Sequence, residues 1–387
     1  MPFDIDEACR PLIEAHLLPR DAGDTRTAAA GRLGTWTRAH AALVARHVDP
    51  SRACRELADA YERCQLPSGL VVRSDPSAPD GASHGLLDPP FAAYVVARLA
   101  LDSQLLDDDL LESATRQVDA IWEERLPPDT CLPVILHPAE SGTPHSPCFA
   151  PLIESPPGPE WEDEVATLAR SAVGCQLEPA RALRAGHPFV VEDPAFCGWL
   201  LIAFEELGKA WDQRGSSPAA LRLRVRSQMV RDAIEERLWW PAEEIYTAFD
   251  RGRGEPLRAV GAGGLVPVAS RTLLAEGNAK RAVDRYLRPS GSPLWGALGL
   301  LAEPLRGAPG DPRDQDHAGI SPLYHYWAHL ALVRAGRGSD ARVARSQLEA
   351  LVEAHGSHDA YDPVAGVGRD GQGSLLGALL LEMSSAD

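Results

Sequence analysis

The chain is short of positive charge. Its 387 residues include 38 lysines and arginines against 55 aspartates and glutamates, which gives a formal net charge of -17. Nucleic acids and anionic membrane surfaces are bound through basic faces. The sequence therefore predicts neither a nucleic-acid partner nor a membrane partner.

Long apolar runs and a secretory signal are also missing. No stretch approaches the ~18 apolar residues that a membrane-spanning helix needs, and the first residues (MPFDIDE) lack a basic segment followed by an apolar one. The seven cysteines are odd in number, scattered and never in a Cys-x-x-Cys pair. This pattern is typical of reduced thiols, so we expect a cytoplasmic protein.

Motifs for nucleotides, metals and serine nucleophiles are absent. The chain has no Gly-x-Gly-x-x-Gly with an acidic partner, no Walker A sequence and no Gly-x-Ser-x-Gly elbow. His325 and His329 are four residues apart, a spacing that suits a metal on a helix, but no matching carboxylate accompanies them. We expect neither a cofactor nor a metal.

Helical periodicity dominates what is present. Apolar residues recur at helical spacing in ten segments, and glycine and proline cluster between them. The segments are Thr27–His47, Ser51–Cys64, Pro89–Leu101, Leu110–Leu126, Glu160–Arg181, Asp193–Arg214, Pro218–Leu238, Pro322–Ala335, Ser339–His355 and Gly373–Met383. Asp-Pro pairs at Asp49, Asp88 and Asp193 are typical of helix starts. The pattern predicts one all-α domain over residues 1–387, a closed ring of helical hairpins whose long connections (74–87, 126–159 and 305–320) build a site.

An ordered series of motifs is more specific than any one of them. It consists of Trp36 before HVDP (47–50), DPP (88–90), HPAESGTPHSP (137–147), HPFVVEDPAF (187–196), YDP (361–363) and GVG (366–368). In this order and spacing the chain resembles the glycosidase clan of trehalases, processing α-glucosidases and bacterial glucosylglycerate or mannosylglycerate hydrolases. The resemblance implies an all-α (α/α)6 toroid with a pocket formed by loops at one end.

The resemblance also implies an inverting hydrolysis. In the clan a general acid protonates the leaving oxygen, and a carboxylate base activates water on the opposite face of the sugar. The acid lies in a Trp-Glu-Ser-Gly-x-Asp-x-Ser-Pro loop and the base in a Glu-Tyr-x-Asp-Pro-x-x-Gly loop. Here the acid position is Pro144 and the base position is Asp359. Glu140 of the first loop is expected to brace it rather than to react.

Several side chains with which the clan holds sugar hydroxyls are also replaced. The replacements include Thr37, Asp88, Ala139, Cys197, Ala360 and the segment 322–327. A sugar hydroxyl buried without a partner costs about 1–3 kcal/mol. We therefore expect an enzyme on a retained barrel that has lost sugar hydrolysis and runs acid–base chemistry (a cyclisation, rearrangement, elimination or hydrolysis) on a small, relatively apolar metabolite. Two alternatives stay open: an active inverting α-glycosidase with a relocated acid, and a non-catalytic ligand-binding protein.

Ten residues are candidates for the site. His145, Asp359 and Asp88 are the proton-transfer candidates, although His145 could equally face solvent and Asp359 could cap a turn. The candidates for binding a small-molecule ligand are Trp36, His40, Arg38, His137, Cys197, Tyr326 and Trp327. Because residues four apart share a helix face, His40 is favoured over Arg38 as the neighbour of Trp36.

Overall fold

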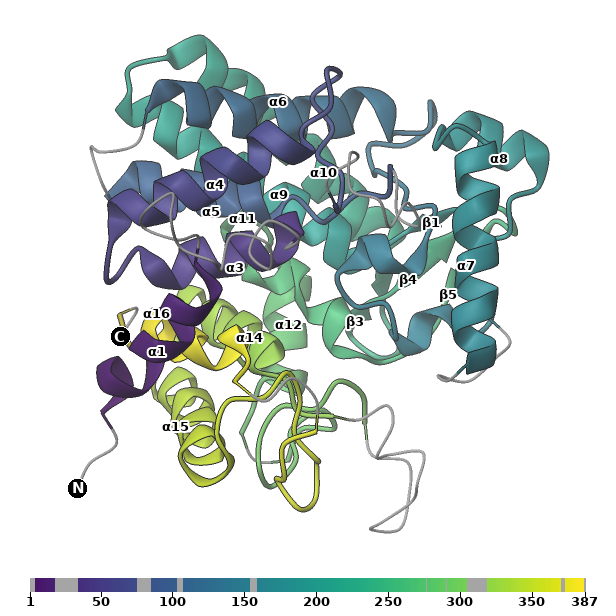
Figure 1. Ribbon diagram of the computed structural model, residues 1–387. Coiled ribbons are helices and arrows are strands. Elements are labelled where there is room, and N and C mark those ends of the chain that lie inside the picture. The colour runs from purple at the N-terminus through teal and green to yellow at the C-terminus, as the bar shows by residue number, and fades with distance from the viewer. Residues whose placement is uncertain are drawn as a thin grey trace.

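The computed structural model of the chain (Figure 1) describes residues 4–17, 34–74, 85–102, 107–153, 159–275, 277–289, 291–304, 319–369 and 373–385. Residues 27–33 of the first predicted helix lie outside these ranges. So do 75–84, 154–158 and 305–318, which belong to the three predicted connections.

An inner ring of helical segments forms the centre of the molecule. Each of six segments contacts the next, and the last contacts the first. They are α3 (Thr35–Ala45), α5 (Phe91–Asp102), α9 (Pro194–Gln213), the short η3 (Ala262–Leu265) with η4 (Pro267–Ala269), α14 (Pro322–Arg334) and α16 (Leu379–Ser385). The inner helices are rich in alanine and large apolar residues that are buried almost all round, as a helix enclosed on every side requires.

An outer layer of helices covers this ring. It comprises α1 (Ile5–His16), α4 (Pro50–Cys64), α6 (Asp108–Glu124), α10 (Ser217–Arg237), α11 (Arg271–Leu274) with α12 (Gly277–Tyr286), and α15 (Gly338–His355). Helices α4, α6, α10 and α15 pack on the inner helix that precedes them in the chain, and α1 packs beside α16 (Figure 1). The prediction of an all-α (α/α)6 toroid is confirmed.

Two helices and several short strands lie to one side of the ring (Figure 1). The helices are α7 (Pro159–Gly174) and α8 (Pro179–Ala185). One antiparallel sheet joins β1 (Val191–Glu192), β4 (Ala248–Asp250) and β5 (Glu255–Leu257), and a second joins β2 (Trp239–Trp240) to β3 (Ile245–Tyr246). The single helix predicted over Glu160–Arg181 is wrong. The chain leaves the helical conformation at Gln176 (φ 57°) and Leu177 (φ 55°), and α8 starts afresh at Pro179.

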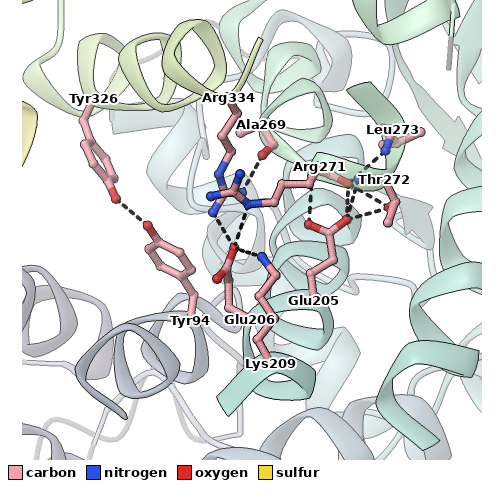
Figure 2. A network of polar contacts seen from close by, with 11 residues as sticks. Tyr94, Glu205, Glu206, Lys209, Ala269, Arg271, Thr272, Leu273, Tyr326 and Arg334 are labelled. Carbon is pink, nitrogen blue, oxygen red and sulfur yellow. Dashed lines mark hydrogen bonds and ion pairs between the residues drawn. The ribbon is translucent and has the colours of Figure 1, made fainter. Parts of the chain in front are cut away.

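Buried ion pairs join the inner helices near the C-terminal ends of α14 and α3. Arg334, the last residue of α14, donates to Glu206 of α9 at 2.7 Å and to the Ala269 carbonyl at 2.5 Å (Figure 2). Glu382 of α16 accepts from Arg46 at the end of α3 (2.6 Å) and contacts His47 at 2.7 Å. The contacts of Glu382 lie where the two ends of the ring in the sequence, α3 and α16, come together.

None of the described helices is long and apolar enough to cross a membrane. All seven cysteines lie within the described residues, and none of them forms a disulfide.

Candidate active site

The N-terminal ends of the inner helices gather at one end of the ring. Helices α3, α9 and α14 are each joined by a short connection to the outer helix that packs on them, so each forms an antiparallel hairpin. The inner helices therefore run in the same direction along the axis of the ring. Their first turns carry Trp36 and Phe91, and Asp88 precedes α5 by three residues.

Contacts between loops connect these N-terminal ends to one another. On the side of α3 and α5, the Thr35 N–H donates to the Arg73 carbonyl (3.3 Å) and the Leu87 N–H donates to Glu140 (2.8 Å). Farther round the ring, the Ala262 N–H donates to the Ala302 carbonyl (2.8 Å), and the Ala302 N–H donates to the Gly319 carbonyl (3.0 Å). Ile320 pairs with Tyr361, and Asp359 accepts a hydrogen bond from Ser374. Asp88 lies just before the inner helix α5, and Asp359 lies between the outer helix α15 and the inner helix α16, so both belong to the end of the barrel at which the inner helices begin, although they lie far apart in the sequence.

Asp88 is a buried carboxyl between α3 and α5. Its Oδ2 accepts a hydrogen bond from the Trp36 backbone N–H at 2.9 Å, and its Oδ1 lies 3.9 Å from the Arg73 guanidinium. Burial raises the pKa of Asp88 from 3.8 to about 6; Arg73 and the Trp36 N–H lower it, and Glu140 raises it further. The Asp-Pro pair predicts a cap for α5, but the carboxyl instead bonds to α3 and can hold a proton near pH 6.

The loop at 137–149 packs against Asp88 and Trp36. Its brace is Glu140, which is fully buried, pairs with Arg125 at 3.0 Å and accepts from the N–H groups of Leu87 (2.8 Å) and Leu136 (2.7 Å). Glu140 therefore holds the loop, as the sequence predicts.

Gly142 sets how closely this loop approaches the barrel. Its φ of 75° is in the left-handed region, and a Cβ there would lie 3.0 Å from the Trp36 ring and 3.1 Å from Pro89. Only glycine permits both the backbone conformation and the close approach to Trp36.

Three candidates of this region have different surroundings. His137 is buried and caps the first short helix of the loop through Nδ1, while its Nε2 contacts the Val165 carbonyl at 3.0 Å. His145 is exposed, with its ring 4.4 Å from that of Trp161 on α7. Cys197 is fully buried in the first turn of α9, and burial raises the pKa of its thiol. None of the three is brought next to Asp88 by a contact within the described residues.

Aromatic rings from four inner helices run from Trp36 into the barrel. The centroid of His40 lies 4.7 Å from Trp36 and 4.3 Å from Phe91, on which it stacks. Phe91 lies 4.7 Å from Trp199 of α9, and Trp199 lies 5.9 Å from Trp327 of α14. Trp36 and Trp327, two of the predicted ligand-binding residues, are thus connected by aromatic rings rather than separated by an aliphatic core.

Three ring nitrogens in this column are buried without a hydrogen-bond partner among the described residues: Nε2 of His40, Nε1 of Trp199 and Nε1 of Trp327. Burial lowers the pKa of His40 to about 4, so its ring is neutral at physiological pH. His40 Nδ1 lies 2.8 Å from the Trp36 carbonyl, so this nitrogen carries the proton and Nε2 is an acceptor. Because unsatisfied buried polar atoms are uncommon, the two N–H donors and this acceptor are suited to a polar ligand or to water.

The remaining candidates lie at the edges of this column. The hydroxyl of Tyr326 is 3.0 Å from that of Tyr94, between α14 and α5 (Figure 2). Arg38 lies between α3 and α4, where it pairs with Asp59 (2.5 Å) and Glu56 (3.6 Å). The ring of His40 contacts that of Trp36, whereas Arg38 is directed toward α4.

Asp359 is an exposed carboxyl at the same end of the barrel. It lies in the loop after α15 and accepts from the hydroxyl of Ser374, the residue that caps η5 (Leu375–Ala378) before α16. This contact holds the carboxylate at the start of η5, which packs with α16 on the inner helix α3. Among the described residues no three His, Cys, Asp or Glu side chains are placed to hold a metal ion.

Sequence reasoning missed Arg73, Phe91 and Trp199. Arg73 follows a short bridge of Val72 with Leu87, a non-local pairing that has no sequence signal. Trp199 is one apolar residue in the uniformly apolar run of α9, so periodicity gives no direction to its side chain. The Asp-Pro-Pro motif next to Phe91 is the available signal, but it indicates a helix start and a role for Asp88, not the direction of the Phe91 ring.

The match to known proteins covers most of the chain. Residues 33–373 match the mannosylglycerate hydrolase MGH1-like glycoside hydrolase domain. The chain belongs to this family. A mannosylglycerate hydrolase of Rubrobacter radiotolerans is 25% identical over 90% of each chain. A mannosylglycerate hydrolase of Thermus thermophilus in complex with Tris has a TM-score of 0.80 at 21% identity and covers 99% of this chain and 100% of its own. Neutral trehalase from Saccharomyces cerevisiae has a TM-score of 0.60 at 14% identity, with 92% and 72% covered.

These comparisons correct the function expected from the sequence. The hypothesis that the barrel had exchanged sugar hydrolysis for acid–base chemistry on a small, apolar metabolite is wrong, because the family and the relatives are glycoside hydrolases. The alternative of an active glycosidase fits better. The error has a physical cause. The hypothesis counted hydroxyl partners as lost by sequence position, whereas the replacement Asp88 keeps a polar group there, and Arg73 and the ring nitrogens of the aromatic column add others at the same end of the barrel.

Proposed function

We propose that the protein is an inverting α-glycosidase that hydrolyses a glycoside of a short hydroxy acid, with Asp88 as general acid and Asp359 as base. Relatives named mannosylglycerate hydrolases support the substrate class. The observation that carries the catalytic assignment is the buried carboxyl of Asp88 beside Trp36.

A general acid must hold its proton until the leaving oxygen needs it. An ordinary aspartate is ionised near neutral pH, but burial raises the pKa of Asp88 to about 6. The carboxyl also adjoins the loop of Gly142, where the resemblance places the clan's acid at Pro144. Asp88 therefore supplies, from the neighbouring loop, the proton that proline cannot.

Asp359 is exposed and takes the role of base. Its carboxylate removes a proton from a water molecule, and the water oxygen attacks the anomeric carbon as the bond to the aglycone oxygen breaks. Asp88 gives its proton to that leaving oxygen. The products are a sugar of inverted anomeric configuration and the free hydroxy acid, and one water is consumed. Asp359 is one methylene shorter than the clan's Glu, and the Ser374 hydroxyl orients it.

Arg73 suits the carboxylate of the aglycone. Its Nη1 donates to the Ala139 carbonyl at 2.7 Å and lies 3.9 Å from Asp88, and its side chain is 40% exposed. A guanidinium binds a carboxylate through two N–H groups. An acidic aglycone bound there would have its glycosidic oxygen next to the proposed acid.

The first test is turnover of mannosylglycerate, glucosylglycerate and neutral aryl α-glycosides, with the product anomer followed by proton NMR. We expect hydrolysis of a glycoside with an acidic aglycone and initial release of the β-anomer. No turnover of any of these substrates would overturn the proposed function.

The second test distinguishes the role of Asp88 as acid from that of Asp359 as base. We expect Asp88→Asn to lose activity on natural glycosides but to keep it on a glycosyl fluoride, whose leaving group needs no proton, whereas Asp359→Asn should lose both. Asp119→Asn is the matched control, because Asp119 also has a raised pKa but lies on the outer helix α6. Equal loss on both substrates in Asp88→Asn would contradict its role as acid.

A further inference from the structure

The outer helix α10 exposes a stripe of large apolar side chains. Its buried face consists of Ala220, Leu223, Ser227, Val230 and Ile234. On another face, Leu221, Val225 and Met229 are 60%, 50% and 40% exposed. Because residues four apart lie on one side of a helix, these three side chains form a continuous line. Single exposed apolar residues are ordinary, but a contiguous line of them indicates a contact surface.

Charge is distributed unevenly along α10. The half before the middle (217–226) contains three arginines and no acid, a net charge of +3. The half after it (227–237) contains two arginines against three acids, a net charge of -1. A parallel pairing of two such helices would place the two basic halves together. An antiparallel pairing places each basic half against the more acidic half of its partner.

A hollow marks the acidic end of the stripe. It has a volume of about 520 Å³ and lies between α10 and α12; its lining residues are Arg231, Asp232, Glu235, Glu236, Gly277 and Asn278. Asp232 and Glu236 are exposed there. The side chains of Arg222 and Arg224 at the other end are 47% and 57% exposed. Their present partners, Asp119 and Asp212, form surface pairs worth about 0–1 kcal/mol each, so these arginines can re-pair at little cost.

We infer that α10 is the interface of a two-fold symmetric homodimer, in which it packs antiparallel on α10 of a second copy. The apolar line of Leu221, Val225 and Met229 forms the centre. Arg222 and Arg224 of each copy reach the acidic hollow of the other. Such a surface is self-complementary, as two-fold symmetry requires. At ~1.5 Å per residue the 21-residue helix is about 31 Å long; a single helix pair buries less than the ~800 Å² per partner of a standard interface, so the dimer dissociates on dilution.

Sedimentation velocity over a concentration series tests this inference. We expect the wild-type protein to shift from monomer to dimer as concentration rises. Val225→Asp should raise the dissociation constant at least about ten-fold, because it buries an unpaired charge at the centre of the interface. Val343→Asp is the matched control, since Val343 is 41% exposed on the outer helix α15 and should leave the dissociation constant unchanged.

An experiment with two charge-reversed variants tests the antiparallel geometry. One variant carries Arg222→Glu with Arg224→Glu, and the other carries Asp232→Arg with Glu236→Arg. Each alone places like charges together and should be monomeric, whereas a 1:1 mixture should form a heterodimer, since both contacts are then complementary. The heterodimer also proves that both variants are folded. A wild-type protein that stays monomeric, or a mixture that does not associate, would overturn the inference.

Discussion

The buried carboxyl of Asp88 makes the stability of the protein depend on pH in a defined direction. Its pKa in the folded protein, about 6, lies above the ordinary 3.8. The folded state therefore holds this proton more tightly than the unfolded state. Its contribution is fully present below pH 3.8 and is lost as the pH rises through 6. At 1.36 kcal/mol per pKa unit, the loss amounts to about 3 kcal/mol in total.

Asp88→Asn isolates this effect, because asparagine cannot ionise yet can still accept the Trp36 N–H. Most of the loss of this contribution to the free energy of unfolding occurs between about pH 4 and 6. We expect the free energy of unfolding of the wild type to fall relative to that of the variant by about 1.5 kcal/mol between about pH 5 and 7.5. Urea denaturation at both pH values measures it. Asp359→Asn, at an exposed carboxyl, should show no such change. A difference between wild type and Asp88→Asn that is independent of pH, or grows in the other direction, would refute the reasoning.

Three further predictions concern the same end of the barrel. Because Arg73 lowers the pKa of Asp88, Arg73→Met should move the alkaline limb of kcat/KM from near pH 6 to higher pH, and should raise KM for acidic but not for neutral aglycones. Glu140→Gln should lower the free energy of unfolding by about 3–5 kcal/mol in urea, because it leaves the buried Arg125 without its carboxylate; a loss below 1 kcal/mol would contradict the bracing role. Trp199→Phe removes a buried N–H that has no partner among the described residues, so it should weaken substrate binding; the smaller ring also leaves a cavity in the core and should lower the melting temperature.

The sequence predicts the helices well and their interruptions less well. Local signals suffice where an Asp-Pro pair caps a helix, and the carboxyls of Asp49 and Asp193 do bond to the backbone N–H groups of Arg52 and Phe196. They failed across Glu160–Arg181, where apolar spacing continues through a break. They also gave no helix at Ile5–His16, whose apolar residues recur at helical spacing but whose Pro11 is unusual inside a helix.

The site was less predictable than the fold because its residues meet through contacts distant in sequence. The ten candidates came from motifs, and motifs indicate which residues are near one another in the chain. They could not indicate that Asp88 would bond to Trp36 rather than cap its own helix, or that Arg38 would turn toward α4. For the same reason His145 was placed beside the acid position by sequence, while in the structure its ring contacts Trp161.

The contacts of Trp36 explain how polar groups come together at one end of this barrel. Its backbone N–H binds Asp88, its carbonyl binds His40, and its ring packs where a Cβ on Gly142 would lie 3.0 Å away. A side chain at position 142 would therefore push the loop off Trp36 and open Asp88 to water. Because burial is the main cause of the raised pKa of Asp88, hydration would lower that pKa toward 3.8. Gly142→Ala should then impair the proposed acid without touching it, and its kcat/KM should fall off at lower pH than that of the wild type; an unchanged profile would mean that the loop does not control the protonation of Asp88.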